Sequence, residues 1–254
     1  MYISSAQNPR IKELLALQEK SRLRREKGLF VVEGKRELQH CLEAGFEVDC
    51  LFVCPEIAQE SFEGRVFEVS AQVYEKIAYR GGTEGVVAIV KARPSGLDSI
   101  KLGPSPLVVV LESVEKPGNL GAVLRSADAA AADAVIICDP LTDLYNPNLI
   151  RASIGAVFTT QVAACTSEEA ISWLKGNGIR ILTAQLQDSE WYYDTDMRGG
   201  TAIVIGTEAT GLTDCWREAA DAHIKIPMLG RLDSLNASVS AAILLFEAVR
   251  QRNA

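Results

Sequence analysis

Short apolar runs alternate with amphipathic stretches in the N-terminal part of the chain. This pattern predicts strands at LFVVEG, VDCLFVC and GVVAIVKAR, and helices at residues 8–27, KRELQHCLEAG and SAQVYEKIAY. The first helix would begin at Asn8-Pro9, because proline suits the first helical position, and Gly45 would end the second. Together these elements predict a small α/β domain of about 90 residues.

The pattern is interrupted at RPSGLDSIKLGPSP, which holds three prolines and two glycines and almost no large apolar residue. Such a composition is typical of a linker. We therefore predict a first domain at residues 1–93, a linker at 94–106 and a second domain at 107–254.

Strands and helices alternate again in the second domain. Strands are predicted at 107–112, 134–139, QVAAC, RILTAQL, TAIVIG and AHIKIP, and helices at 119–132, 147–157, SEEAISWLKGNG and SLNASVSAAILLFEAVRQR. Ser167 would cap the third of these helices. Nearly continuous apolar strands that alternate with helices predict a parallel sheet covered on both faces.

One arginine stands out in the helix predicted at 119–132. The apolar stripe of that helix is Leu120, Val123, Leu124, Ala127 and Ala131, at the spacing of a buried face. Arg125 falls off the stripe, and the residues that share its own face are all small: Gly118, Gly121, Ala122, Ala129 and Ala132. A ligand could approach that face closely and meet the guanidinium group.

Charge is distributed unevenly along the chain. The net charge is −7, which argues against a nucleic-acid-binding protein, but residues 1–40 carry nine Lys/Arg against five Glu. The remaining residues carry 17 basic and 28 acidic side chains. The basic segment is either an arm that faces nucleic acid or a solvated helix with i,i+4 ion pairs, and charge alone leaves both open.

The six cysteines are scattered, and no C-x-x-C or histidine cluster is present to form a metal site. We expect reduced, structural cysteines in a cytoplasmic protein without a bound metal. No apolar run is long enough to span a membrane, and the N-terminus lacks the apolar run of a secretory signal.

Three loops follow predicted strands at the carboxyl edge of the sheet, where parallel sheets bind ligands. They are ESVEKPGNLG, GTEATGL and PMLGRLDSLN. No G-x-G-x-x-G follows a strand, Leu212 stands where a P-loop needs lysine, and a serine nucleophile with a histidine base is missing. The polar residues at the loop–helix junctions are Asn119, Arg125, Glu208, Ser234 and Asn236.

Each of these polar residues also has a structural interpretation. Asn119 could cap its helix, Arg125 could pair with Asp128, and Glu208 could bind the amides of its own turn. Ser234 or Asn236 could cap the last helix. Because three such junctions occur at strand ends, the set together favours a binding site.

The same loops resemble three ordered motifs of the SpoU-type (TrmH) RNA ribose 2′-O-methyltransferases of the SPOUT superfamily. The segments are NLGAVLRSADAA, IVIGTEATGL and IKIPMLGRLDSLNASVSAAILLFEAVRQ. The N-terminal NPRIKELLAL and FVVEGKRELQHCLEAG resemble the L30e-like substrate-binding domain that these enzymes often carry. Ala131 stands where glycine is common and Ala237 where valine is usual, and both changes are small.

The resemblance implies an α/β catalytic domain with a deep trefoil knot, a homodimer with its active site near the subunit interface, and S-adenosylmethionine as methyl donor. Backbone groups of Gly206, Ile226 and Leu235 would hold the cofactor, with Met228 close by. Arg125 would act on the ribose hydroxyl, either by taking its proton with help from the substrate phosphate or by stabilising the alkoxide as a cation. Because arginine stays protonated, the first role is chemically difficult.

The resemblance gives the other polar residues supporting roles. Asn119 would shape the setting of Arg125, Glu208 would fix the cofactor loops, and Ser234 and Asn236 would line the reacting pocket.

The resemblance also implies a structured RNA substrate. The RNA-contact residues would be Arg10, Arg22, Arg24, Arg25 and Lys27 with Lys35 and Arg36, and Arg151 and Ser153 would bind phosphate near the site. The added N-terminal domain favours ribosomal RNA. The alternatives are a tRNA ribose methyltransferase and a non-catalytic RNA-binding relative. A nucleotide-dependent oxidoreductase is a third alternative, and the missing G-x-G-x-x-G motif argues against it.

Overall fold

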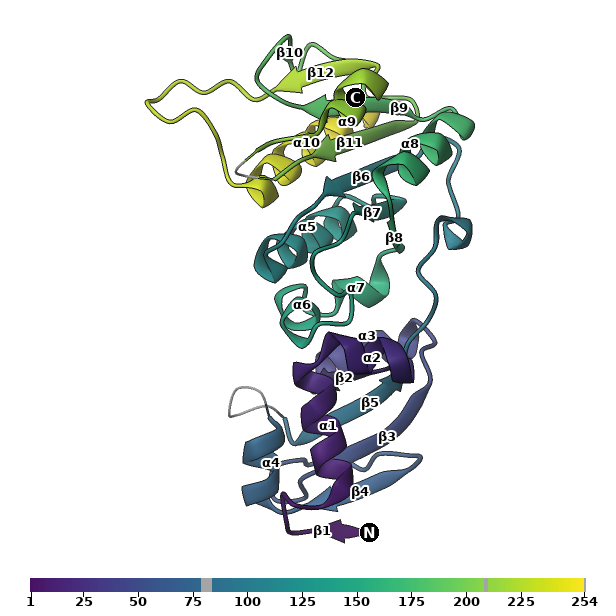
Figure 1. Ribbon diagram of the computed structural model, residues 1–254, viewed down its shortest axis with the longest axis vertical. Coiled ribbons are helices and arrows are strands. Elements are labelled where there is room, and N and C mark those ends of the chain that lie inside the picture. The colour runs from purple at the N-terminus through teal and green to yellow at the C-terminus, as the bar shows by residue number, and fades with distance from the viewer. Residues whose placement is uncertain (79–83, 208–209, 254) are drawn as a thin grey trace. The chain divides into compact units, whose positions relative to one another are not determined.

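The computed structural model describes residues 1–78, 84–207 and 210–253, which form two compact units (Figure 1). The first unit comprises Met1–Pro94 and Asp143–Thr159, and the second comprises Ser95–Thr142 and Thr160–Ala254. These boundaries differ from the predicted ones in two respects. Residues 143–159 pack with the first unit, and the predicted linker packs with the second.

The first unit is built on a mixed sheet, not on a purely parallel one. Its described strands are β1 (Tyr2–Ile3), β2 (Leu29–Glu33), β3 (Val48–Val53), β4 (Val66–Val69) and β5 (Val86–Lys91), in the order β1-β4-β3-β5-β2. Its helices are α1 (Pro9–Glu19), α2 (Ser21–Lys27), α3 (Lys35–Glu43), α4 (Ala71–Ile77), α6 (Pro147–Ala152) and α7 (Ala156–Thr159). β5 is antiparallel to both β2 and β3. The sequence pattern did not predict β1 or β4.

An aromatic cluster explains why residues 143–159 belong to the first unit. Tyr145 stacks on Phe30 of β2 with ring centroids 4.2 Å apart, and Phe158 of α7 lies edge-on to Phe46 at 5.3 Å. Such rings bury large apolar areas. Burial of these rings therefore places residues 143–159 in the first unit, although the residues before and after them in the sequence belong to the second.

The helix predicted at 8–27 is two helices, broken at Lys20, and Arg24 binds backbone carbonyl groups at the break. Lys20 has an extended backbone with φ −107° and ψ 103°. The Arg24 guanidinium turns back to donate from Nη1 to the carbonyl oxygens of Leu17 (2.6 Å) and Gln18 (3.0 Å), and from Nε to Asp143 Oδ2 (2.6 Å). It therefore satisfies carbonyl groups that α1 leaves free at its end.

The second unit contains a wholly parallel sheet, as the sequence predicted. Its seven described strands are β6 (Leu107–Glu112), β7 (Ala134–Cys138), β8 (Val162–Cys165), β9 (Arg180–Ala184), β10 (Glu190–Trp191), β11 (Thr201–Ile205) and β12 (Ala222–Lys225). The order is β10-β12-β9-β11-β6-β7-β8. The helices are α5 (Pro117–Ala129), α8 (Ser167–Gly176), α9 (Asp214–Ala219) and α10 (Ala237–Arg252), with the 3₁₀ turn η1 (Leu97–Ser99).

Helices cover both faces of this sheet, as near-continuous apolar strands require. On one face α8 and α9 contribute Leu174 and Trp216 to a core that includes Val108 and Ile136 (Figure 1). On the other face α5 packs against α10, and α10 contacts β11. The predicted linker also packs on the core that contains Leu174 and Trp216, through Leu97, Ile100 and Leu102.

Several helix ends differ from their predictions: the helix predicted at 147–157 is the two helices α6 and α7, and the last helix begins at Ala237, not at Ser234. The stripe residues Leu120, Val123, Leu124 and Ala127 of α5 are buried as predicted, but Ala131 is exposed and lies beyond the helix with φ 50°. Thr166, not Ser167, caps α8, in a capping box with Glu169.

The six cysteines are free, and four of them are buried. Burial raises the pKa of the Cys41 and Cys50 thiols to about 12. Those two thiols are therefore unreactive at neutral pH. Among the described residues no helix is long and apolar enough to cross a membrane.

The buried Arg24–Asp143 pair predicts a large stability effect. Replacing Arg24 with Met leaves Asp143 buried without its cation, because the two side chains are only 4% and 11% exposed. We expect the free energy of unfolding of the first unit to fall by about 3–5 kcal/mol, measured by urea unfolding. Arg22→Met is the matched control and should change it little, because Arg22 forms an exposed pair with Glu26. An Arg24→Met protein of unchanged stability would contradict this assignment.

Candidate functional site

The strands of the second unit run in the same direction, so their carboxyl ends meet at one edge of the sheet. β9 and β12 pair in parallel, and β9 also pairs with β11. The segments that leave these strands therefore start side by side. They begin at Gln185, Gly206 and Ile226.

A cavity of about 370 Å³ lies at this edge. Its lining includes four residues that the sequence motifs assigned to cofactor binding, Gly206, Ile226, Met228 and Leu235, and the predicted catalytic residue Ser234. The structure thus places these five residues, which come from two separate loops, in the lining of one cavity. Their roles stay predictions.

Gly206 allows the loop after β11 to fold back on itself. A Cβ atom at this position would lie 2.3 Å from the carbonyl carbon and 2.4 Å from the carbonyl oxygen of Gly211. Thr207 and Gly211 form an antiparallel bridge across the turn, with Gly211 at φ 70°. No side chain fits in so short a distance, so position 206 requires glycine.

A buried carboxylate holds the far end of the same loop. Glu112, at the end of β6 and 3% exposed, accepts hydrogen bonds from Thr213 N (2.9 Å) and Thr213 Oγ1 (2.5 Å). Ser167 Oγ lies 3.4 Å from Glu112 Oε1 and accepts a hydrogen bond from Trp216 Nε1 at 3.0 Å. The loop is therefore fixed at both of its ends.

Two asparagines join α5 to the start of α10. Asn236 Nδ2 donates to Asn119 Oδ1 at 3.1 Å, and Asn236 Oδ1 accepts from Ser238 N at 2.9 Å. Asn236 is thus the N-cap of α10, as one of its two interpretations predicted. Asn119 does not cap α5, because Lys116 is the N-cap of that helix.

Asn236 lies between two residues of the cavity lining, Leu235 and Ala237. Ser234 is exposed, and its hydroxyl lies 3.3 Å from Asp233 Oδ1. The Asn119–Asn236 bond therefore connects the first predicted motif to the third beside the cavity.

Arg125 does not belong to the cavity lining. It lies on the exposed side of α5 and forms no hydrogen bond or ion pair with another residue that the structure describes. Its guanidinium group is therefore available to a ligand or to another chain. Glu208, the remaining predicted catalytic residue, lies outside the described residues.

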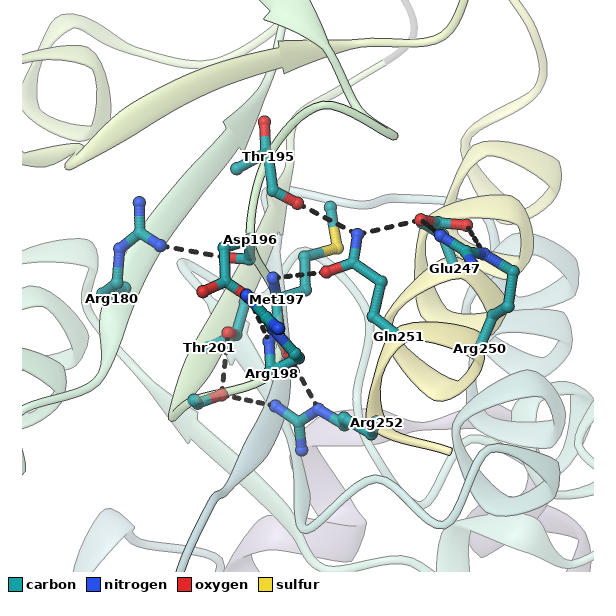
Figure 2. A network of polar contacts seen from close by, with 11 residues as sticks. Arg180, Thr195, Asp196, Met197, Arg198, Thr201, Glu247, Arg250, Gln251 and Arg252 are labelled. Carbon is teal, nitrogen blue, oxygen red and sulfur yellow. Dashed lines mark hydrogen bonds and ion pairs between the residues drawn. The ribbon is translucent and has the colours of Figure 1, made fainter. Parts of the chain in front are cut away.

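Polar contacts at the end of α10 fix the segment that precedes β11 (Figure 2). Gln251 Oε1 accepts from Met197 N at 2.8 Å, and its Nε2 donates to Thr195 O at 3.0 Å. Arg252 donates to the carbonyl oxygens of Met197 (2.9 Å) and Gly199 (2.6 Å). These bonds join α10, whose N-cap is Asn236, to the segment before β11.

The cavity lining also contains polar residues that the motifs did not single out. They are Gln185, Gln187, Thr207, Thr210, Arg217, Lys225, Asp233 and Ser240. Gln185 directly follows the parallel strand β9. Because parallel sheets bind ligands at the carboxyl ends of their strands, the sequence could also have indicated Gln185. The motif match did not include that strand.

Most of the predicted RNA-contact residues lie in ion pairs of the first unit. Arg10 pairs with Glu13 at 3.4 Å, Arg22 with Glu26 at 2.6 Å and Arg151 with Glu33 at 3.8 Å, while Lys27 also contacts Glu13. Arg22 and Arg25 on α2 remain exposed, as does Arg36. Lys35 pairs with Glu60, and Ser153 is buried.

Arg24 is a correction to the predicted RNA surface. Its side chain is 4% exposed and is held by Asp143 and by two backbone carbonyl groups of α1. A guanidinium group enclosed in this way cannot reach a phosphate. The charge pattern could not distinguish it from its exposed neighbours.

Comparisons with known proteins agree with this geometry. Residues 106–246 match the SpoU rRNA Methylase family, and residues 8–88 match an MRM3-like substrate binding domain. A 23S rRNA (uridine(2479)-2′-O)-methyltransferase of Streptomyces viridochromogenes is 30% identical, over 98% of this chain and 92% of its own length.

Two solved structures are similar over almost the whole chain. The crystal structure of an RNA 2′-O ribose methyltransferase has a TM-score of 0.88 and 38% identity, with both chains fully covered. An AdoMet-bound rRNA methyltransferase from Sinorhizobium meliloti has a TM-score of 0.90 and 32% identity, over 98% of this chain and 97% of its own. The chain belongs to the SpoU rRNA methylase family.

Proposed function

We propose that this protein transfers a methyl group from S-adenosylmethionine to a ribose 2′-oxygen of ribosomal RNA. The observation that carries the proposal is the Asn119–Asn236 hydrogen bond, which joins two motif segments 117 residues apart beside a cavity at the carboxyl edge of the sheet. The names of the relatives support rRNA as the substrate class.

The cavity suits S-adenosylmethionine in size and in chemistry. Its volume falls within the range of about 300–1,000 Å³ that is usual for small-molecule sites. Buried Ile224 and Leu244 offer an apolar slot for the adenine ring, and Asp233 is the only carboxylate among the described lining residues. Asp233 would hold the cofactor ammonium, and Arg217 or Lys225 would hold its carboxylate.

When bound, S-adenosylmethionine supplies a methyl group on a positively charged sulfur, so the protein mainly has to position the acceptor. The bond that forms joins the ribose oxygen to the methyl carbon, the carbon–sulfur bond breaks, and the hydroxyl proton leaves. Arg125 would either take that proton with help from the RNA phosphate or remain charged and stabilise the alkoxide while the proton passes to water. Both roles need its planar guanidinium group.

We propose that Asn119 and Asn236 fix the geometry around Arg125, that Glu208 fixes the cofactor loops, and that Ser234 contributes to the acceptor pocket. Backbone groups of Gly206, Ile226 and Leu235 would hold the cofactor beside Met228. The cavity lining supports the last of these assignments, because it contains all four residues.

The protein would act as a cytoplasmic homodimer. Leu229 and Leu232 in the loop before α10 are 96% and 75% exposed, and Val239 and Phe246 on α10 are 46% and 48% exposed. Large apolar side chains that gather on a surface are typical of a protein–protein contact. Since Arg125 does not line the cavity of its own chain, a second copy would complete the site.

The first unit would bind the RNA. Its match to a substrate-binding domain supports this role, and the exposed Arg22 and Arg25 are the candidate phosphate contacts on α2. Arg10, Lys27 and Arg151 would contribute by exchanging their carboxylate partners for phosphate. Arg24 is excluded from this surface.

The decisive experiment maps ribose methylations in total RNA from a strain that lacks the gene. We expect the loss of a single 2′-O-methyl mark in ribosomal RNA and its return when the gene is restored. Loss of a mark in tRNA instead would reassign the substrate. An unchanged methylation map would refute the proposed reaction.

Replacing Arg125 with Lys keeps the positive charge but removes the planar fork. We expect the single-turnover rate of methylation to fall about a hundred-fold or more on ribosomal RNA purified from the deletion strain, with S-adenosylmethionine binding unchanged. Arg198→Lys, at an exposed site of the same unit, is the control and should keep its rate. A near-normal rate in Arg125→Lys would exclude both roles of Arg125.

Replacing Gly206 with Ala places a methyl group against the backbone of Gly211. We expect binding of S-adenosylmethionine to weaken by at least about ten-fold in calorimetric titration, because the loop cannot keep its turn. Gly230→Ala is the matched control, since nothing lies within 4 Å of a Cβ atom there. Equal binding by both variants would mean that the loop after β11 does not shape the cofactor site.

A further inference from the structure

Among the described residues of the cavity lining, one buried side-chain polar atom has no hydrogen-bond partner. The side-chain oxygen Oε1 of Gln185 is buried and has no hydrogen bond with the described part of the chain, although Gln185 lines the cavity. Buried acceptors in proteins are almost always hydrogen-bonded. An orphaned acceptor at a binding site therefore indicates that the ligand supplies the donor.

The orientation of this amide is fixed by its other end. Gln185 Nε2 donates to the carbonyl oxygen of Gln187 at 2.9 Å, so the nitrogen is engaged and the oxygen is the free end. The backbone is fixed as well, because Gln185 N donates to Ile224 O at 3.0 Å and extends the pairing of β9 with β12. The acceptor is therefore held in place before a ligand arrives, which lowers the entropic cost of binding.

The other lining residues decide which donor can meet this oxygen. Gln185 follows β9, and the neighbouring strands contribute Ile205 and Ile224, which are 4% and 0% exposed. An apolar environment of this kind suits a flat nucleobase and disfavours a charged group. The ammonium group of the cofactor would instead bind Asp233, because Asp233 is the carboxylate among the described lining residues.

We propose that Gln185 selects the adenine base of the cofactor, its Oε1 accepting a hydrogen bond from the exocyclic amine. This inference rests on the proposed use of S-adenosylmethionine. Gln185 would be a specificity-determining residue. A base with a carbonyl oxygen in place of the amine would place that oxygen against Gln185 Oε1, and two acceptor oxygens cannot form a hydrogen bond. The protein would then discriminate adenosine-containing ligands from inosine-containing ones.

The test compares two ligands that differ at this group. S-adenosylhomocysteine carries the amine and S-inosylhomocysteine carries a carbonyl oxygen, and binding of each to the full-length protein is measured by calorimetry without any RNA. We expect the unaltered protein to prefer the adenine ligand by about ten-fold or more. In Gln185→Met, which keeps the volume but loses the acceptor, we expect the two affinities to converge to within about two-fold.

Gln187→Met is the matched control, because Gln187 lines the same cavity with an exposed side chain and offers Gln185 only its backbone oxygen. It should keep the full preference for adenine. Thermal unfolding without ligand checks that both variants are folded. A preference that is the same in Gln185→Met and in the unaltered protein would overturn the proposal.

A third ligand distinguishes the adenine amine from the ribose hydroxyls. If Gln185→Met instead abolished a preference for S-adenosylhomocysteine over its 2′-deoxy or 3′-deoxy analogue, Gln185 would bind the ribose and the proposal would be wrong. Failure of the unaltered protein to bind S-adenosylhomocysteine at all would contradict the proposed function itself. The two failures are therefore distinguishable.

Discussion

The parallel direction of the second sheet is the constraint on which the rest of the site depends. It brings the ends of β9, β11 and β12 to one edge, so that loops from separate parts of the sequence line one cavity. Convergence alone would leave the loops mobile. The close approach of Gly206 to Gly211 and the buried carboxylate of Glu112 anchor the two described ends of one of them.

The sequence predicted the parallel sheet of the second unit well, because apolar runs along single strands are enough to indicate it. Continuous apolar strands indicated a doubly covered parallel sheet, and the four residues that the motifs assigned to the cofactor line one cavity, although that role stays a prediction. The knot and the catalytic roles stay predictions. What the pattern could not reveal were contacts between distant residues. The stacking of Tyr145 on Phe30 assigns residues 143–159 to the first unit, and no local rule contains that information.

The basic residues of the first unit also show that local sequence does not reveal contacts between distant residues. Arg24 and Arg25 are neighbours of identical type, yet one is enclosed by Asp143 and the end of α1 while the other faces solvent. The difference arises from the helix break at Lys20, which turns Arg24 inward. A count of basic residues therefore overestimates the surface available to RNA, because part of that charge stabilises the fold.

The position of Arg125 bears on how the site is assembled. It follows Asn119 by six residues on α5, a rise of about 9 Å along the helix. The Asn119–Asn236 bond joins α5 to the N-cap of α10, and the backbone of Arg125 lies nearly two helical turns farther along α5. One chain supplies a cavity for the cofactor and a separate exposed arginine on the helix that packs against α10. We propose that a second copy, docked on exposed apolar residues of α10 such as Val239 and Phe246, brings the two together.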